Sequence, residues 1–187
     1  MLGGEFREVM SAAARGDEAA FARLWRDSQP PLLRYLHVIT GEAAEDVASE
    51  VWLEVSRRLE RFRGGEGEFR CWLFATARRR VIDLRRHAAR RPEVLSEEPG
   101  DMDRRAPDDT AAAALERMST AAALELIASL PREQAEIIVL RVIADLDARQ
   151  VARIVGKRPG AVRVAAHRGL RALAASLLRP SDQGVSR

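Results

Sequence analysis

The sequence contains few cysteine, histidine or aromatic side chains among its 187 residues. With a single cysteine, Cys71, no disulfide framework can be built. The three histidines, His37, His87 and His167, are far apart and have no close His or Cys neighbour at ligand spacing, so we expect no metal site. Aromatic residues make up only 5% of the chain, which argues against a large β-sandwich or barrel.

Long apolar runs are missing too. No stretch longer than seven residues lacks a charged side chain, whereas a membrane-spanning helix needs about 20 apolar residues. The N-terminal segment MLGGEFREVM contains acids where a secretory signal has a basic start and an apolar run. We therefore expect no membrane insertion and a cytoplasmic protein. No Walker-type phosphate loop occurs, because no Lys and Ser/Thr follow the glycines of residues 64–67, and nothing points to a catalytic residue or a cofactor.

Charge is abundant and unevenly distributed along the chain. Residues 1–56 carry ten acids and five bases, whereas residues 57–91 carry twelve arginines and four acids. Residues 92–110 carry seven acids and two arginines, and residues 153–179 carry seven bases and no acid. Two basic blocks are therefore separated by an acidic, proline-containing spacer.

Apolar residues recur at helical spacing throughout, and no alternating run is long enough for a strand, so we predict an all-α protein. Asp17 is a suitable N-cap for one helix, and Pro30 and Pro31 are typical of the start of a second. A third helix is expected after Gly41, with one continuous apolar stripe. The stripe consists of Ala48, Trp52, Val55, Leu59 and Phe62.

A fourth helix is expected from about Glu68 to about Arg90, with an apolar side and an arginine-rich side. Its inward-facing residues are expected to be Phe69, Leu73, Ala77, Val81 and Leu84. The next segment, to residue 110, has three prolines, many acids and no apolar stripe. We therefore predict two small helical domains, residues 1–91 and 115–179, joined by a flexible acidic linker at residues 92–114 and followed by a tail at residues 180–187.

The second basic block has the pattern of a helix-turn-helix. Asp147 and Gln150 form a capping-box pattern, a short helix ends at Gly156, and Pro159 starts a longer one. Such a unit presents its second helix to the DNA major groove. The expected inner stripe of the longer helix is Val162, Ala166, Leu170, Leu173 and Leu177.

Bases on the outer face of that longer helix are candidates for DNA binding. An arginine near its start can bond a guanine edge bidentately, and the others can neutralise phosphates. A solvated basic face is the alternative, but the capped helix and the glycine turn favour DNA binding. The candidates are Lys157, Arg158, Arg163, His167, Arg168 and Arg171.

In the first basic block, aromatic residues are interleaved with arginines. Single-stranded nucleic acid is bound by this combination, because cationic groups follow the backbone while aromatic faces receive unstacked bases. We expect Phe69 in the core, whereas Trp72 is either a core residue or a base contact. The arginines beside the aromatics are Arg70, Arg78, Arg79, Arg80, Arg85 and Arg86.

The order and spacing of these stretches resemble the extracytoplasmic-function (ECF) sigma factors of bacterial RNA polymerase. The stretches are AEDVASEVW (44–52), FRGGEGEFRCWLFATARRRVIDLRR (62–86), LPREQAEIIVLR (130–141) and the helix-turn-helix. The resemblance implies a two-domain initiation subunit. Sigma domain 2 would recognise and melt the minus-ten element, sigma domain 4 would read the minus-thirty-five element, and the polymerase core would supply the chemistry.

The resemblance also implies partners and site residues. Asp46 and Glu50 match the acidic helix that docks on the clamp helices of the largest polymerase subunit, and sigma domain 4 would contact the flap of the second largest. The loop from Arg63 to Glu68 matches the element that captures a flipped base. An anti-sigma factor is a common partner in the family. The implied minus-ten residues are Arg63, Gly64, Glu68, Arg70, Trp72, Arg78, Arg79, Arg85 and Arg86, and the six helix-turn-helix bases would read the minus-thirty-five element.

Two other classes of protein compete with this interpretation. A stand-alone helix-turn-helix regulator would account for residues 130–178 but leaves the aromatic–arginine helix and the acidic docking helix without a role. A nucleic-acid enzyme would need clustered acids for metal ions, which the first domain lacks. The linker either threads the polymerase cleft, as in the family, or is a solvated tether. We expect a promoter-specificity subunit with no catalytic activity of its own.

Overall fold

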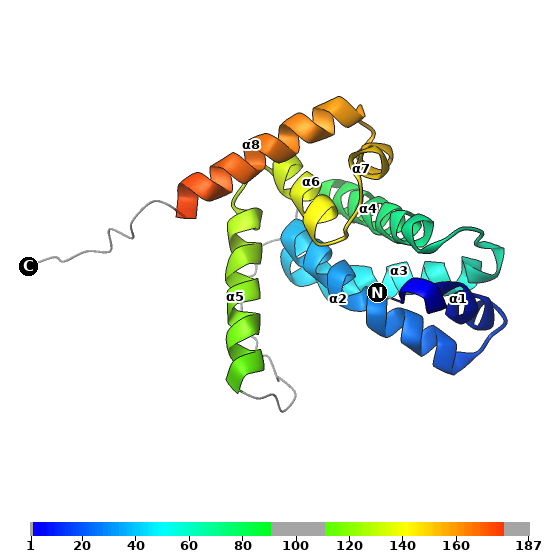
Figure 1. Cartoon of the computed structure of the whole chain (residues 1–187). Helices are drawn as coiled ribbons and strands as arrows, with labels where there is room; N and C mark the ends of the chain where they lie inside the picture. Colours follow the sequence, from blue (N-terminus) through cyan, green and yellow to red (C-terminus); the bar gives the residue numbers. More distant parts are fainter. Residues whose placement is uncertain (1, 91–110, 178–187) are drawn as a thin grey trace, which may run out of the picture.

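The computed structural model describes residues 2–90 and 111–177, and all regular structure in these ranges is helical, which confirms the all-α prediction (Figure 1). The N-terminal module, residues 2–90, contains α1 (Phe6–Ala14), α2 (Glu18–Thr40), α3 (Ala44–Arg58) and α4 (Glu66–Arg90), with short 3₁₀ turns η1 (Gly3–Glu5), η2 (Gly41–Ala43) and η3 (Leu59–Arg61). The C-terminal module, residues 111–177, contains α5 (Ala111–Ala128), α6 (Arg132–Val142), α7 (Ala148–Val155) and α8 (Pro159–Leu177).

The segment predicted as a linker, residues 92–114, lies mostly outside the described residues. Its last four residues belong to α5, which begins at Ala111. The predicted tail at residues 180–187 lies outside the described residues. None of the described helices is long and apolar enough to cross a bilayer.

Helix α2 runs without a break through Pro30 and Pro31, where the sequence predicts a new helix. A proline inside a helix removes a backbone hydrogen bond and costs about 3 kcal/mol. Leu24, Leu32 and Tyr35 are buried on both sides of the prolines, and burying each large apolar side chain contributes about 1.5–3 kcal/mol. The expectation of two helices is wrong because packing of one continuous face offsets the local cost.

The apolar stripe predicted for α3 is the inner face of the N-terminal module. Ala48, Trp52 and Val55 are buried, and Leu59 continues the stripe into η3. The Trp52 indole donates a hydrogen bond to Gln29 Oε1 of α2 at 2.5 Å, so its polar edge is satisfied where the ring enters the core. On α4, Leu84 is exposed rather than buried. Its prediction as an inward-facing residue is wrong because the core contacts of α4 end at Val81.

The two modules share one apolar core. Helix α6 packs against α2, and α7 packs against α4 (Figure 1). Ile137, Leu140 and Leu146 of the C-terminal module belong to the same cluster of buried residues as Leu32 and Tyr35 of α2. The sequence predicts two domains but not that their cores are continuous.

The helix-turn-helix consists of α7, the turn at Gly156, and α8. Asp147 and Gln150 form the predicted capping box. Gly156 adopts the left-handed conformation with φ 71°, which favours glycine because it has no Cβ. The prediction of a short capped helix followed by a longer one is confirmed.

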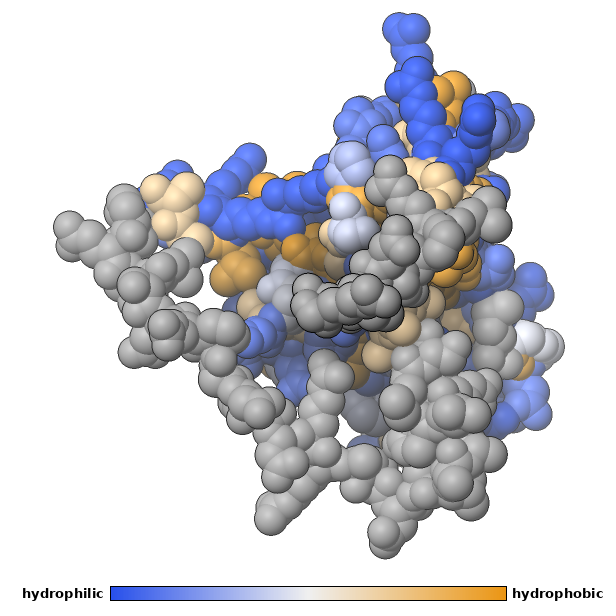
Figure 2. All heavy atoms as spheres, turned by 90° about the vertical axis from the view of Figure 1, so that its left-hand side faces the viewer, coloured by the Kyte–Doolittle hydropathy of each residue, from blue (hydrophilic) through white to orange (hydrophobic). Residues whose placement is uncertain are grey.

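The core-facing side of α8 differs from its predicted stripe. Leu170 and Leu177 are exposed, whereas Gly169 is buried. At Gly169 the helix approaches α6 so closely that an added Cβ would collide with Ile138 Cδ1. The space-filling view from the α5 and α8 side shows apolar surface left open between hydrophilic side chains (Figure 2). The prediction for Leu170 and Leu177 is wrong because the side of α8 that faces the core runs through Val162, Gly169 and Leu173, and the two leucines lie outside it.

The capping aspartate makes the stability of the helix-turn-helix depend on pH. Hydrogen bonds from the backbone N–H groups of Gln150 and Arg149 lower the pKa of the Asp147 carboxyl. Its stabilising contribution is therefore present above the unfolded-state pKa of about 4 and is lost as the pH falls through the lower folded-state pKa. Asp147→Asn keeps a capping oxygen but does not ionise. We expect the difference in Tm between wild type and Asp147→Asn to shrink as the pH is lowered from about 5 to about 3, as measured by circular dichroism. A difference in Tm that stays constant over this range would contradict the assignment.

Candidate nucleic-acid interface

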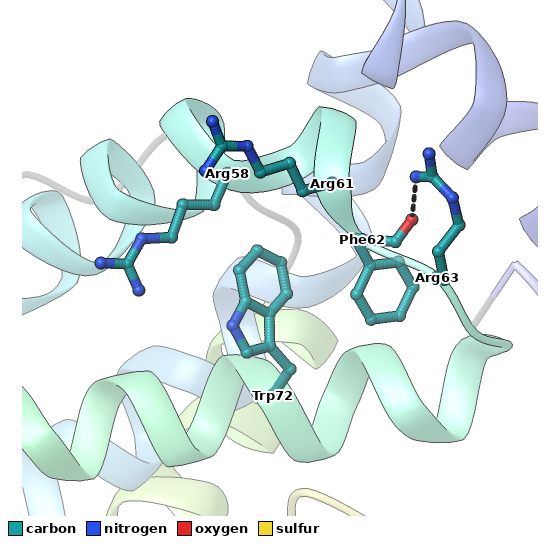
Figure 3. A pocket seen from close by; sticks show the side chains of 5 residues that line it. All are labelled: Arg58, Arg61, Phe62, Arg63 and Trp72. Carbon is teal, nitrogen blue, oxygen red and sulfur yellow. Dashed lines mark hydrogen bonds between the residues drawn. The ribbon is translucent and has the colours of Figure 1, made fainter.

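A pocket of about 540 Å³ opens where α3 ends and α4 passes beneath it (Figure 3). Its lining combines arginines with two aromatic rings. The lining residues are Arg58, Arg61, Phe62, Arg63 and Trp72. Helix α3 ends at Arg58, η3 carries Arg61, and the extended backbone at Phe62 brings its ring against α4.

The Trp72 ring is half-buried, with one part in the module and one part in the pocket. It stacks on Phe62 with ring centroids 5.4 Å apart and an angle of 20° between the planes. Phe69 meets the edge of Trp72 and is buried, as predicted. Trp72 therefore packs on Phe62 and Phe69 and also lines the pocket, and its contact with a base stays a prediction.

The loop beside the pocket is held by its own hydrogen bonds. The Gly65 N–H donates to Glu68 Oε2 at 2.9 Å, and the Arg63 guanidinium donates to the carbonyl of Glu60 at 2.7 Å. Gly64 has φ 153°, and a Cβ there would lie 2.8 Å from the Cβ of Glu68. Gly64 is thus required by the turn geometry, while Arg63 and Glu68 stabilise the loop.

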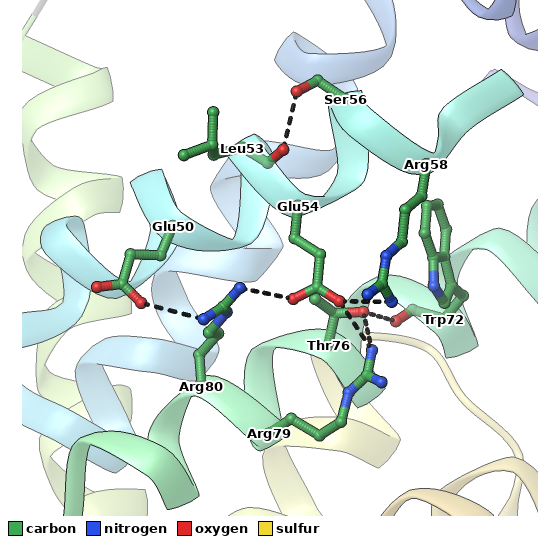
Figure 4. Close-up of polar contacts among 9 residues, drawn as sticks. All are labelled: Glu50, Leu53, Glu54, Ser56, Arg58, Trp72, Thr76, Arg79 and Arg80. Carbon is green, nitrogen blue, oxygen red and sulfur yellow. Dashed lines mark hydrogen bonds and ion pairs between the residues drawn. The ribbon is translucent and has the colours of Figure 1, made fainter. Parts of the chain in front are cut away.

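Three arginines at the α3–α4 contact surround acidic side chains of α3 (Figure 4). The Glu54 carboxylate, 12% exposed, pairs with Arg58 at 2.9 Å, Arg80 at 2.9 Å and Arg79 at 3.4 Å. Arg80 also approaches Glu50 at 3.8 Å. The same carboxylate therefore fixes Arg58 at the pocket and Arg79 on α4.

The other arginines predicted for DNA binding on α4 lie in different surroundings. Arg86 is exposed and lies 4.0 Å from Asp83, and Arg85 donates to the Ile39 carbonyl at 2.7 Å. Arg70 and Arg78 instead face the C-terminal module, where they pair with Asp145 and Glu136. Side chains that the sequence groups together are thus divided between solvent and the contact between modules.

The predicted DNA-binding residues of the helix-turn-helix remain on its surface. Arg163, His167, Arg168 and Arg171 are exposed along α8. Lys157 and Arg158 are exposed at the turn before it, where Lys157 Nζ pairs with Glu133 at 2.7 Å. This positive face is open to a polyanion.

The outer face of α3 carries Asp46 and Glu50, both exposed. Leu53, one turn further on, is 52% exposed, so an apolar residue joins the two acids. Leu53 is not among the residues predicted from the sequence, although its position outside the buried α3 stripe is visible there. Arg58 and Arg61 are likewise absent from that set, because their role depends on the pocket that the chain forms around Trp72.

Comparison with known proteins assigns the chain to a family. The model of Sigma-70 region 2 matches residues 20–91, and the model of Sigma-70, region 4 matches residues 120–173. The ECF RNA polymerase sigma factor ShbA of Streptomyces griseus is 38% identical over 177 residues, covering 89% of this chain and 92% of its own. The ECF RNA polymerase sigma factor SigD of Mycobacterium tuberculosis is 32% identical over 196 residues, covering 97% of this chain and 88% of its own.

A solved structure, that of CnrH in complex with the cytosolic domain of CnrY, shares the fold with a TM-score of 0.61 at 21% identity, covering 92% of this chain and 96% of that one. The two family models place this helical chain with its basic surface in the sigma-70 class of transcription proteins. More narrowly, the chain belongs to the ECF RNA polymerase sigma factors. It is an alternative sigma factor that binds core RNA polymerase and directs transcription initiation at promoter DNA.

The arginine cluster on α3 and α4 leads to a stability prediction. Glu54→Ala removes the carboxylate that lies between three guanidinium groups and leaves them to repel one another. We expect the free energy of unfolding to fall by about 1–3 kcal/mol, because a part-buried charged network loses its central acceptor. Urea denaturation followed by circular dichroism measures this change.

The matched control is Glu50→Ala, which removes an acid that is 63% exposed from the same helix. Its effect should stay within about 0.5 kcal/mol, as for most surface substitutions. Equal effects of the two substitutions would show that Glu54 has no special structural role.

Proposed function

We propose that the N-terminal module recognises and opens the minus-ten element and that the C-terminal module reads the minus-thirty-five element. The observation that carries the proposal is the pocket around Trp72, in which guanidinium groups surround an aromatic ring. Such a pocket can receive a base that has left the stack, because the indole provides a stacking face while the arginines attract the adjacent phosphates. Duplex DNA cannot place a paired base in it, so binding there favours separated strands.

In this proposal the minus-ten strand runs along the surface formed by η3, the loop of residues 63–67 and the exposed part of α4. Arg58 and Arg61 extend the set expected from the sequence. Arg79 and Arg86, both more than half exposed, contact the backbone of the strand. Gly64, together with the hydrogen bonds that Arg63 and Glu68 make to the backbone, holds the loop in the shape that closes one side of the pocket.

The C-terminal module contributes duplex recognition. Arg163 lies in the first turns of α8, where a recognition helix meets base edges, while His167, Arg168 and Arg171 follow along the exposed surface of the helix and contact phosphates. Lys157 and Arg158 approach the backbone at the entry to α8. The alternative of a solvated basic face would predict no dependence on promoter sequence.

Docking on the polymerase involves a separate surface in this proposal. Asp46 and Glu50, with Leu53 beside them, bind the clamp helices of the largest subunit, and the C-terminal module contacts the flap of the second largest. The chain supplies specificity and strand opening, and core polymerase performs RNA synthesis. The protein then works in the cytoplasm on the chromosome, and an anti-sigma factor is a possible partner.

Trp72→Ala tests the pocket through strand opening. Losing one base–aromatic stacking contact costs about 1–3 kcal/mol, so with core polymerase we expect formation of the open complex to fall by roughly 5- to 150-fold. Fluorescence of 2-aminopurine placed in the minus-ten element measures opening, and a filter assay measures duplex binding, which should change much less. Trp25→Ala, which removes a partly exposed tryptophan of α2, is the matched control.

Because Trp72 also packs on Phe62, its loss can lower stability, so a second pair of variants is needed. Arg61→Ala removes an exposed pocket residue, and Arg57→Ala removes an exposed arginine of α3 that does not line the pocket. Opening should fall with Arg61→Ala and stay near wild type with Arg57→Ala. If, within each pair, the pocket variant and its control open the promoter equally well, the pocket does not receive a base.

Arg163→Ala tests duplex recognition. If Arg163 bonds a base edge, the substitution should weaken binding of the polymerase complex to its promoter by about 1–3 kcal/mol and relax the sequence preference at one position. If it contacts phosphate, affinity should fall on all sequences and the salt slope should decrease by about one. Arg132→Ala, at the start of α6, makes the same charge change at an exposed residue that is not part of α8. Binding that matches this control at every salt concentration removes Arg163 from the interface.

A further inference from the structure

A second pocket, of about 390 Å³, lies next to the pocket around Trp72. It opens between α1 and the chain that runs from η3 into the loop before α4. Phe62 and Arg63 line both pockets, so the two share a wall, and Figure 3 shows Phe62 between Trp72 and Arg63. None of the α1 residues in this pocket is among those that the sequence predicts to bind DNA. A strand that enters the first pocket and continues past Phe62 therefore reaches the second.

Helix α1 is held beside the first pocket by contacts between aromatic rings. The Phe69 ring meets Phe6 of α1 at a centroid distance of 5.8 Å and meets Phe62 at 5.7 Å. It also meets Trp72 at 6.0 Å, and both Phe6 and Phe69 are buried. Because one buried ring contacts the other three, core packing sets the position of α1 relative to Trp72.

The wall that α1 contributes is cationic. Arg7, Ser11 and Arg15 follow one another at intervals of four residues, so they lie on one side of the helix. Both arginines are exposed, and Arg15 Nη1 donates to Ser11 Oγ at 2.6 Å. Arg63 adds a third guanidinium group from the loop. Within residues 2–90 and 111–177, no carboxylate forms an ion pair with any of these three arginines, so their charges are available to an anionic ligand.

The floor of the second pocket is apolar, and one acid lies at its rim. Met10 is 7% exposed, and the Phe62 ring is half-buried. Glu60 of η3 is exposed and lines the same pocket. Its backbone carbonyl accepts from Arg63, whereas its carboxylate accepts no hydrogen bond from the described part of the chain. The lining therefore offers an apolar surface, three cations and one carboxylate acceptor.

A nucleotide has the chemistry that fits this lining. Its phosphates accept charge-assisted hydrogen bonds from guanidinium groups, and its base covers apolar or aromatic side chains. An amino group on the base donates to a carboxylate. A free phosphate would use the arginines but would leave the apolar floor uncovered and would be repelled by Glu60. The excess of cations thus favours an anionic ligand, and Glu60 favours one that also carries a donor.

We propose that the second pocket holds a neighbouring unpaired nucleotide of the minus-ten strand, with Arg7 and Arg15 on its flanking phosphates and Glu60 on an amino group of its base. This inference rests on the proposed role of the Trp72 pocket in strand opening. Eight residues of helix separate the two arginines by about 12 Å along the axis, so their long side chains can reach both sides of one nucleotide. Phe62 then separates two adjacent bases of the same strand.

The Glu60 carboxylate gives the second pocket a base preference. Adenine, cytosine and guanine each carry an exocyclic amino group, whereas thymine carries carbonyl oxygens in the corresponding positions. A carboxylate accepts a hydrogen bond from an amino group and repels a carbonyl oxygen. The pocket should therefore disfavour thymine. Glu60→Gln should remove this preference, because an amide both donates and accepts.

The double variant Arg7→Ala with Arg15→Ala tests the phosphate contacts. The probe is a fluorescent promoter fragment that the wild-type chain opens with core polymerase, prepared with its minus-ten segment single-stranded, and anisotropy measures its binding to the polymerase complex. We expect affinity to fall about tenfold or more, because two hydrogen bonds to charged groups are lost. The salt slope should decrease by about 0.7 for each lost phosphate contact.

The matched control for this pair is Arg26→Ala with Arg57→Ala, which removes two exposed arginines that line neither pocket. The side chains of Arg7 and Arg15 are also exposed, so their loss should leave the fold intact. A fragment that contains only the paired minus-thirty-five element should bind all of these variants equally.

Glu60→Gln tests the base contact. Each single-stranded position of the same probe carries adenine and then thymine. With the wild-type chain, thymine at one position should weaken binding by about fivefold or more, and Glu60→Gln should lose this effect at that position alone. Glu8→Gln, which removes an exposed acid of α1 outside the pocket, should keep the wild-type preference.

The proposal is overturned if the double arginine variant binds the probe as its control does, or if Glu60→Gln leaves the preference between adenine and thymine unchanged at every position. Trp72→Ala is measured on the same probe and in the opening assay. If Trp72→Ala behaves as the wild type, the proposed function is wrong. If it impairs opening while the variants of the second pocket match their controls, only the second pocket is wrong.

Discussion

Pairing between guanidinium groups and anionic or carbonyl oxygens along α4 is the constraint on which both modules depend. A helix with arginines on several faces would repel itself, and the protein supplies acceptors from α3, α2 and the C-terminal module. Glu54 neutralises Arg79 and Arg80, the Ile39 carbonyl accepts from Arg85, and Glu136 accepts from Arg78. These acceptors differ in burial. Exposed pairs contribute at most about 1 kcal/mol and can be exchanged for phosphates, whereas part-buried Glu54 and Glu136 hold their partners until the surrounding structure moves.

In the proposed function, the N-terminal module uses the two sides of one helix for different partners. The outer side of α3 presents Asp46, Glu50 and Leu53, and its contact with α4 contains Glu54, which fixes Arg58 at the pocket around Trp72. Glu50 belongs to both sides, because it is exposed on the outer side of α3 and also lies near Arg80 of α4. The surface proposed for polymerase docking and the pocket proposed for strand binding therefore lie on opposite sides of the same helix.

The two modules are in contact through their shared core, but in the proposed function each binds a different promoter element. Shared burial of Tyr35, Ile137 and Leu140 stabilises the contact between the modules, whereas the proposed function places the modules on two promoter elements. Linking two weak sites raises the effective concentration of the second once the first is bound. In the proposed function, two individually modest contacts can thus give firm promoter binding.

Local sequence determined much of the candidate site, because the signals that define it are local. The Asp147–Gln150 capping box, the buried α3 stripe, the core position of Phe69 and the exposed bases of α8 all follow from the identity of neighbouring residues and from helical spacing. The aromatic and arginine content around Trp72 likewise predicted where single-stranded DNA would bind, although that role remains a prediction.

Only the tertiary structure decided which arginines of α4 face solvent and which face the other module. Arg78 and Glu136 are 58 residues apart in the chain, and Tyr35 and Glu136 are 101 residues apart, so no local pattern pairs them. Likewise, the continuous α2 through two prolines and the burial of Gly169 in place of Leu170 depend on surfaces contributed by distant helices. Helical spacing shows which residues share a face. Whether that face is buried, and how much its burial stabilises the fold, depends on the distant segment that packs against it.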